Sequence, residues 1–267
     1  RVNDFAMTLP DRGPAAQVAV FYPGPTVTAQ DIFDPARALN IDLARLTLVN
    51  NMQNTGVPYD LYNLADIPLL EQSGLLAQYR LCIFLNPFYL TADERQSLEL
   101  CKSDGHVLVW LWAPGIARVG KALSPELVAD VTGISGINWK KERMAPVCRI
   151  SAPEHPLFAG MPPGEDIAPV PYPLGSTWER YGNEIGPVLY VDPAAAGDAE
   201  VLGSYVVDGA LREDMGALCL REVKQGDRLQ WASFYSAVPY LSRTMLRNLA
   251  RYAGVHVYRN SEDILYA

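Results

Sequence analysis

Cysteine is scarce in this 267-residue sequence, and none of its cysteines belongs to a C-x-x-C pair. Each of the four lies within an apolar segment: Cys82, Cys101, Cys148 and Cys219. Buried thiols behave as small hydrophobic residues, so we expect them to pack in the core rather than form disulfides or a zinc site. Free thiols are typical of a reducing compartment, which makes the cytoplasm the expected location.

Closely spaced histidines, basic clusters, long apolar runs and nucleotide motifs are also missing. The three histidines show no H-x-x-x-H or H-E-x-x-H spacing, so the sequence predicts no metal site. The formal net charge is -8 and no basic run exceeds Lys140-Lys141, which disfavours nucleic-acid binding. No apolar run approaches the about 18 to 20 residues that cross a bilayer, so no membrane partner is expected. Without G-x-G-x-x-G after a strand or a Walker-type lysine, no cofactor is expected.

The composition is that of a globular protein, with 49% hydrophobic and 19% charged residues. Apolar runs at 17–22, 58–64, 79–86 and 106–112 predict strands, and apolar residues at helical spacing predict a helix over 35–56.

A second helix is predicted from a capping box, in which Thr91 and Glu94 satisfy each other's backbone amides, to Gly105. This alternation of strands and helices predicts an α/β sandwich with a mainly parallel central sheet.

The second half of the chain is rich in glycine, proline and short β-like runs. We expect added hairpins and late strands at 147–150, 187–191, 200–207, 216–223 and 228–235. Ser242 caps an amphipathic helix that ends at Gly254, and closing strands are expected at 255–258 and 263–267. No linker composition marks a boundary, so residues 1–267 are predicted to form a single domain.

Ligands of open α/β sheets gather at the carboxyl ends of the strands, where three joints are predicted at 23–28, 86–90 and 112–116. A nucleophile elbow is a strained turn after a strand that presents a reactive side chain. The joint that begins at Trp112 offers indole, methyl and proline surface instead. Asn86 could act at the neighbouring joint or close a turn before Pro87. We therefore predict no catalytic residue, and retain Asn86 and Trp112 as candidates for the lining of a pocket.

Three further residues are candidates in loops. His155 lies in the loop "APEHPLFAGMP" and could serve as a general base if a carboxylate oriented it. Trp178 and Tyr181 lie in an aromatic-rich, loop-like stretch, which fits either core packing or a surface that faces a saccharide or another protein. Acidic pairs such as Asp93-Glu94 could be solvated faces or glycosidase carboxylates, and the sequence does not show two of them converging.

Three stretches resemble a known family. Residues 76–117, "LAQYRLCIFLNPFYLTADERQSLELCKSDGHVLVWLWAPGIA", are similar to the middle domain of β-galactosidases of glycoside hydrolase family 42. "EHPLFAGMP" at 154–162 resembles a phrase of these domains and of class I glutamine amidotransferases, and 233–258 resembles their closing helix and strand. The resemblance covers roughly residues 17–258.

The resemblance implies a flavodoxin-like, amidotransferase-like domain that follows a catalytic (β/α)8 barrel and helps to assemble a trimer. The family's catalytic glutamates lie on the barrel, and the amidotransferase cysteine has no counterpart in the joint at 112–116. The resemblance thus implies a non-catalytic accessory domain of a bacterial β-galactosidase-type enzyme, with its own barrel as partner. The abrupt chain ends fit a segment of a longer protein.

Two other functions stay open at this point. One is a free-standing hydrolase or amidase with a site built from Asn86, Trp112 and His155, which would have to converge in one pocket. The other is a carbohydrate-binding module that uses Trp178 and neighbouring tyrosines.

Overall fold

The computed structural model of the protein describes residues 16–23, 51–164, 166–167 and 184–259. The strands are β1 (Val18–Tyr22), β2 (Tyr59–Asn63), β3 (Leu81–Phe84), β4 (His106–Leu111), β5 (Ile137–Lys140), β6 (Cys148–Ile150), β7 (Asp166–Ile167), β8 (Val188–Val191), β9 (Glu200–Val207), β10 (Ala210–Gln225) and β11 (Arg228–Ser236). The helices are α4 (Ile67–Gln72), α5 (Ala92–Leu100), α6 (Pro125–Thr132) and α8 (Arg243–Tyr252), with 3-10 turns η2 (Met52–Asn54), η3 (Leu64–Asp66), η4 (Leu76–Gln78) and η5 (Pro156–Phe158).

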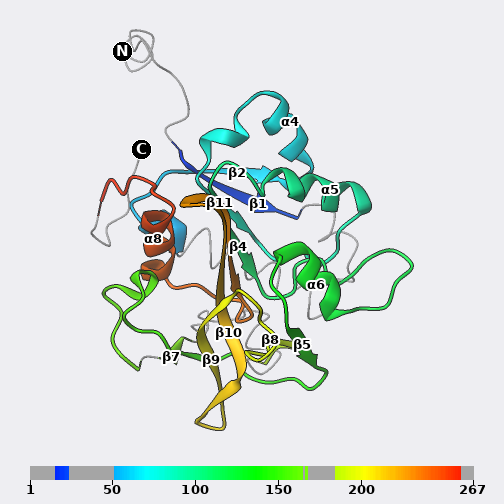
Figure 1. Ribbon diagram of the computed structural model, residues 1–267, viewed down its shortest axis with the longest axis vertical. Coiled ribbons are helices and arrows are strands. Elements are labelled where there is room, and N and C mark those ends of the chain that lie inside the picture. The colour runs from blue at the N-terminus through cyan, green and yellow to red at the C-terminus, as the bar shows by residue number, and fades with distance from the viewer. Residues whose placement is uncertain (1–15, 24–50, 165, 168–183, 260–267) are drawn as a thin grey trace, which may run out of the picture.

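The described strands form one 11-stranded sheet (Figure 1). Its main path is β2-β1-β3-β4-β11-β10-β9-β6-β7, and β8 pairs with both β10 and β5. Strands β2, β1, β3, β4 and β11 run parallel to one another, whereas the pairs from β11 to β7 are antiparallel. The predicted parallel sheet is therefore one part of the fold, and the late strands extend the same sheet in antiparallel order.

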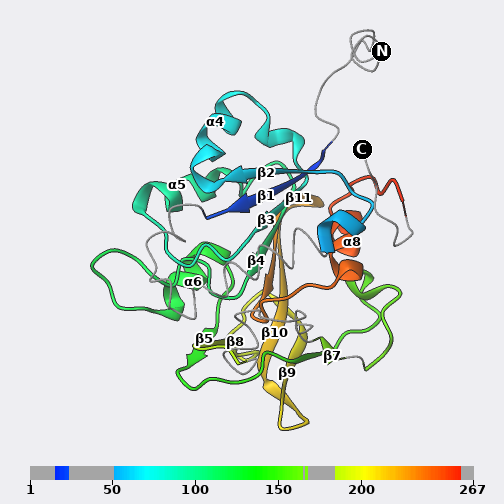
Figure 2. The same ribbon diagram turned by 180° about the vertical axis from the view of Figure 1, so that it is seen from behind.

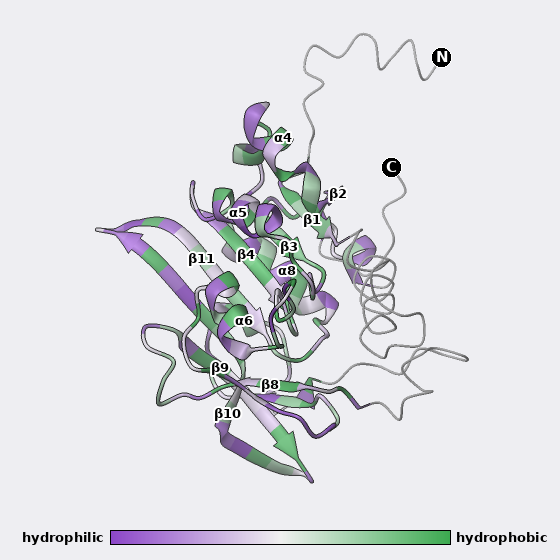
Figure 3. Cartoon of the chain, turned by 90° about the vertical axis from the view of Figure 1, so that its right-hand side faces the viewer, coloured by the Kyte–Doolittle hydropathy of each residue, from purple (hydrophilic) through white to green (hydrophobic). Residues whose placement is uncertain are grey.

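Helices cover both sides of the parallel part. Helices α4, α5 and α6 lie on one side and α8 on the other, as the two opposite views show (Figures 1 and 2). A strand covered on both sides needs apolar residues at every position. Every residue of β3 and β4 is accordingly buried, and Figure 3 shows these strands as mostly hydrophobic.

Local sequence signals account for two helix starts. The Thr91 hydroxyl accepts a hydrogen bond from the Glu94 amide at 3.1 Å, and the Glu94 carboxylate accepts one from the Thr91 amide at 2.8 Å. Ser242 Oγ likewise accepts from the Met245 amide at 3.3 Å, and Gly254, with φ 71°, follows the end of α8. Both predicted caps are confirmed.

The predicted strand at 255–258 is wrong. Val255 is buried, but Tyr258 is 58% exposed, and the segment is held by separate bonds rather than by a strand ladder. One of these joins the Tyr258 amide to the Gly56 carbonyl at 3.0 Å. The sequence reasoning also missed α4, α6 and β5. Most of the predicted helix at 35–56, and the strand at 263–267, lie outside the described residues.

Candidate functional site

Two joints at the carboxyl edge of the parallel strands have left-handed backbone conformations. Asn86, after β3, has φ 43°, and Trp112, directly after β4, has φ 58°. Left-handed residues other than glycine store strain and occur at functional turns. The joint at 112–116 thus has the strained turn after a strand that an elbow requires, and carries an indole at its apex.

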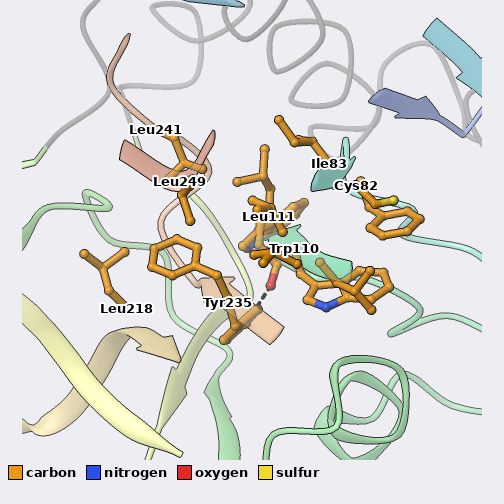
Figure 4. Close-up of a cluster of buried hydrophobic side chains, with 14 of the residues drawn as sticks. Cys82, Ile83, Trp110, Leu111, Leu218, Tyr235, Leu241 and Leu249 are labelled. Carbon is orange, nitrogen blue, oxygen red and sulfur yellow. Dashed lines mark hydrogen bonds between the residues drawn. The ribbon is translucent and has the colours of Figure 1, made fainter. Parts of the chain in front are cut away.

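Trp112 fills the interior of this edge. Only 1% of the surface of Trp112 is exposed, and its indole N–H donates a hydrogen bond to the Pro187 carbonyl at 3.1 Å. The backbone is held equally firmly, because the Trp112 amide donates to the Ser236 carbonyl at 2.7 Å and the Tyr235 hydroxyl donates to the Trp112 carbonyl at 2.6 Å. Figure 4 shows Tyr235 in the buried cluster with Trp110 and Leu111. The indole is therefore buried and fills the interior of the turn.

Asn86 closes the neighbouring joint. It is fully buried, and its side-chain oxygen accepts a hydrogen bond from the Ala113 amide at 3.1 Å. The Gly115 amide donates to the Pro87 carbonyl at 2.7 Å, so the joints at 86–90 and 112–116 are tied to each other. Arg95, from α5, donates to the Gly115 carbonyl from outside. Asn86 and Trp112 thus lie at one edge, where their polar groups bind the protein itself.

Among the described residues, the serine that ends β11 at this edge and the four cysteines are not available to a substrate. Ser236, which the sequence reasoning missed, ends β11 beside β4, but it is buried and its hydroxyl donates to the Val238 carbonyl at 2.6 Å. Its position as the last residue of an apolar run was the signal that could have identified it. All four cysteines are free and buried. Burial raises the pKa of the Cys148 and Cys219 thiols, so they stay protonated and poorly nucleophilic.

His155 lies in a different environment. Its Nδ1 accepts from the Leu157 amide at 3.3 Å, and its ring lies 6.4 Å from the ring of Tyr252. The Tyr252 hydroxyl donates to Glu222, and burial together with this carboxylate raises the pKa of Tyr252. Hydrogen bonds from Lys224 and Tyr252 lower the pKa of Glu222. The described hydrogen bonds of Glu222 thus go to Lys224 and Tyr252, and His155 acts on this carboxylate only through the charge of its ring.

The strand register separates this group from Asn86 and Trp112. Glu222 pairs with Ala232 near the start of β11, whereas Ser236, at its end, pairs with Leu111 beside Trp112. Four residues of strand span about 13 Å. His155 and its neighbours therefore lie toward the amino ends of the parallel strands. Asn86, Trp112 and His155 thus do not converge in one pocket.

The remaining candidates, and residues 24–28 of the predicted joint after β1, lie outside the described residues. Trp178 and Tyr181 are in this part of the chain, so a saccharide-facing role for them stays a prediction. Within the described ranges, no three His, Cys, Asp or Glu side chains are grouped so that they could hold a metal ion. None of the described helices combines the length and apolar character needed to span a membrane.

Comparisons with known proteins find similarity in structure only. No protein-family model matches the sequence, and no curated protein is significantly similar to it. The chain is similar in structure to a β-galactosidase from Bacillus circulans sp. alkalophilus, with 18% identity and a TM-score of 0.51 over 91% of this chain and 32% of that one. A β-galactosidase from the Antarctic haloarchaeon Halorubrum lacusprofundi gives 17% identity and a TM-score of 0.56 over 95% and 32%.

A third similar structure is a GH42 β-galactosidase from G. stearothermophilus, with 13% identity and a TM-score of 0.53 over 90% of this chain and 30% of that one. The chain therefore spans about a third of the length of these enzymes. At these identities the likeness concerns the fold. The resemblance to one portion of family 42 β-galactosidases, stated above from sequence, is thus matched by structure: the chain has the fold of a part of these enzymes.

Proposed function

We propose that the chain is a non-catalytic accessory domain of a β-galactosidase-type glycoside hydrolase. It packs against a separate catalytic barrel of the same longer protein and takes part in contacts between subunits, with a trimer as the expected assembly. The observation that carries the proposal is the closed carboxyl edge, by which we mean the described joints at 86–90 and 112–116, where Trp112 occupies the strained turn with 1% of its surface exposed. The partial coverage of the similar β-galactosidases supports it.

The free-standing hydrolase or amidase is not favoured. Such an enzyme needs a nucleophile and a base within hydrogen-bond reach of each other. Asn86 and Trp112 form one buried group, and His155 lies toward the other end of the strands.

The buried, free thiols also fit a reducing compartment, which supports the cytoplasm as the location.

An activity assay of the 267-residue chain tests the proposal directly. The purified chain should not hydrolyse a chromogenic β-galactoside above the rate of a heat-denatured sample. The Trp112→Phe variant serves as a control, because it preserves an aromatic plug and should be equally inactive. Turnover by the folded chain that persists through further purification would contradict a non-catalytic role.

The surrounding gene provides an independent test. A coding region for a (β/α)8 barrel directly upstream, in the same reading frame, is the expected result. Sedimentation of the complete protein should then give an oligomer, with three subunits expected. A reading frame without a barrel would overturn the proposal even if the isolated chain were inactive.

A further inference from the structure

A cleft of about 280 Å³ lies between α5 and α6, outside the closed carboxyl edge. Both helices lie on the same side of the sheet (Figure 1). Its polar lining consists of Arg95, Gln96, Glu99, Arg118 and Asp130, and the buried Leu98 and Val131 add apolar surface. A small space with a few converging polar groups is typical of ligand sites.

Arg95 is held in position by the protein before any ligand binds. Its guanidinium donates to the Leu127 carbonyl at 3.3 Å and to the Gly115 carbonyl, so it links α5 to α6 and to the joint after β4. A guanidinium has five N–H groups, and these two bonds leave others for the cleft. Its Nε is buried without a hydrogen-bond partner. A ligand in the cleft would therefore meet the terminal nitrogens, which the two carbonyls hold in place, and would lose little affinity to ordering them.

Arg118 supplies a second positive charge in the same cleft. It is exposed and forms no ion pair within the described ranges. Arg95 and Arg118 line the same cleft, and burial and then the charge of Arg118 lower the pKa of Arg95, an effect that Asp130 partly offsets. Glu99 is already paired with Lys102 at 2.6 Å, which leaves Asp130 as the opposing charge. The charges of the lining itself are balanced, with two arginines against Glu99 and Asp130, and Lys102 beside the cleft adds one positive charge in a chain of net charge -8.

We propose that this cleft binds a small hydroxycarboxylate, with the carboxylate between Arg95 and Arg118 and hydroxyl groups at Gln96 and Asp130. Planar carboxylates match the fork of guanidinium donors. The Asp130 carboxylate accepts hydrogen bonds from hydroxyls and repels a second negative charge, so the site selects a monoanion over a phosphate dianion. This inference does not depend on the proposed accessory function.

Paired sugars provide the test, because D-galacturonate carries a carboxylate where D-galactose carries a hydroxymethyl group. Calorimetric titration of the 267-residue chain at constant ionic strength should give saturable binding of galacturonate. Galactose should bind at least tenfold more weakly. Galacturonate should also raise the midpoint of thermal unfolding, since a ligand that binds only the folded state stabilises it.

Two variants locate the site. Arg118→Gln should weaken galacturonate binding by roughly tenfold, as expected for the loss of charge-assisted hydrogen bonds. Arg228→Gln, a matched change at an exposed arginine at the start of β11, should leave the binding constant unchanged. Equal binding of galactose or inorganic phosphate, or an Arg118→Gln variant that binds like the wild type, would overturn the proposal.

Discussion

Asn86 contributes to the closed edge in two ways, and substitutions can separate them. Its backbone is left-handed, and its side chain accepts the hydrogen bond of the buried Ala113 amide. Asn86→Gly keeps the backbone conformation accessible but leaves the amide unpaired, which should cost about 1–3 kcal/mol of unfolding free energy. Asn86→Ala adds the left-handed penalty and should cost about 1 kcal/mol more. Urea unfolding of the two variants measures the difference, and equal losses would contradict a role for the backbone conformation.

His106 should make stability depend on pH. It is 2% exposed, its Nδ1 contacts the Cys101 carbonyl at 3.1 Å, and its Nε2 is buried without a partner. Burial lowers the pKa of His106 below its usual 6.5, an effect that the Cys101 carbonyl, Asp104 and Glu71 only partly offset. The unfolded chain therefore binds the proton more readily than the folded one.

The sign of the effect follows from this difference. The contribution of neutral His106 to the unfolding free energy is fully present above about pH 6.5. It falls as the pH drops from there toward the lower pKa that His106 has in the folded protein, by at most about 1.4 kcal/mol per pH unit. Chemical unfolding of the wild type and of His106→Gln between pH 5 and about 8 tests this expectation. The variant should lose this part of the dependence, whereas identical pH profiles would show that His106 does not cause it.

At the scale of elements, the capping box at the start of α5 offers a test of local signals. Thr91→Ala removes the hydroxyl that accepts from the Glu94 amide and should lower the unfolding free energy by about 1 kcal/mol. Ser97→Ala is the matched control, because the Ser97 hydroxyl bonds to the Asp93 carbonyl in the same exposed helix. That control should change stability by less than about 0.5 kcal/mol. Equal effects of the two would mean that the cap adds nothing beyond a surface hydroxyl.

Elements with a local signal were predictable, and elements set by distant contacts were not. The continuous apolar runs of β3 and β4 and the caps at Thr91 and Ser242 identified their elements from sequence. The sequence of 255–258 is equally typical of a strand, but this segment forms isolated backbone hydrogen bonds with its described neighbours instead of a strand ladder. Whether a segment pairs as a strand depends on the neighbouring strand that it meets in the fold, which the β propensity of the segment does not predict.

The candidate site was predictable in the same limited sense. The order of the strands predicted that the joints at 86–90 and 112–116 meet at one edge, and Asn86 binds the Ala113 amide there. The left-handed backbone of Trp112 and the direction of its indole depend on Pro187 and Tyr235, which are far away in sequence. For the same reason the sequence did not indicate that the ring of Tyr252 lies near that of His155 or that Tyr252 binds Glu222.

At the scale of the whole molecule, β11 joins the two kinds of pairing. It runs parallel to β4 on one side and antiparallel to β10 on the other, along most of its length. Phe234, fully buried, pairs with Val109 on one side and Leu220 on the other. A loss of packing in this strand should therefore destabilise both the parallel and the antiparallel part of the sheet.

Phe234→Ala tests whether the parallel and antiparallel parts unfold together. The change should lower the unfolding free energy by about 3–5 kcal/mol, as for a large buried aromatic side chain. Hydrogen exchange followed by mass spectrometry should then show faster exchange in peptides from β4 and from β10 by similar factors. Leu211→Ala, at the partly exposed end of the β9–β10 hairpin, should leave β4 unchanged. If Phe234→Ala accelerated exchange in only one of the two strands, the sheet would consist of two parts that open independently, because the shared strand would not transmit the loss of packing.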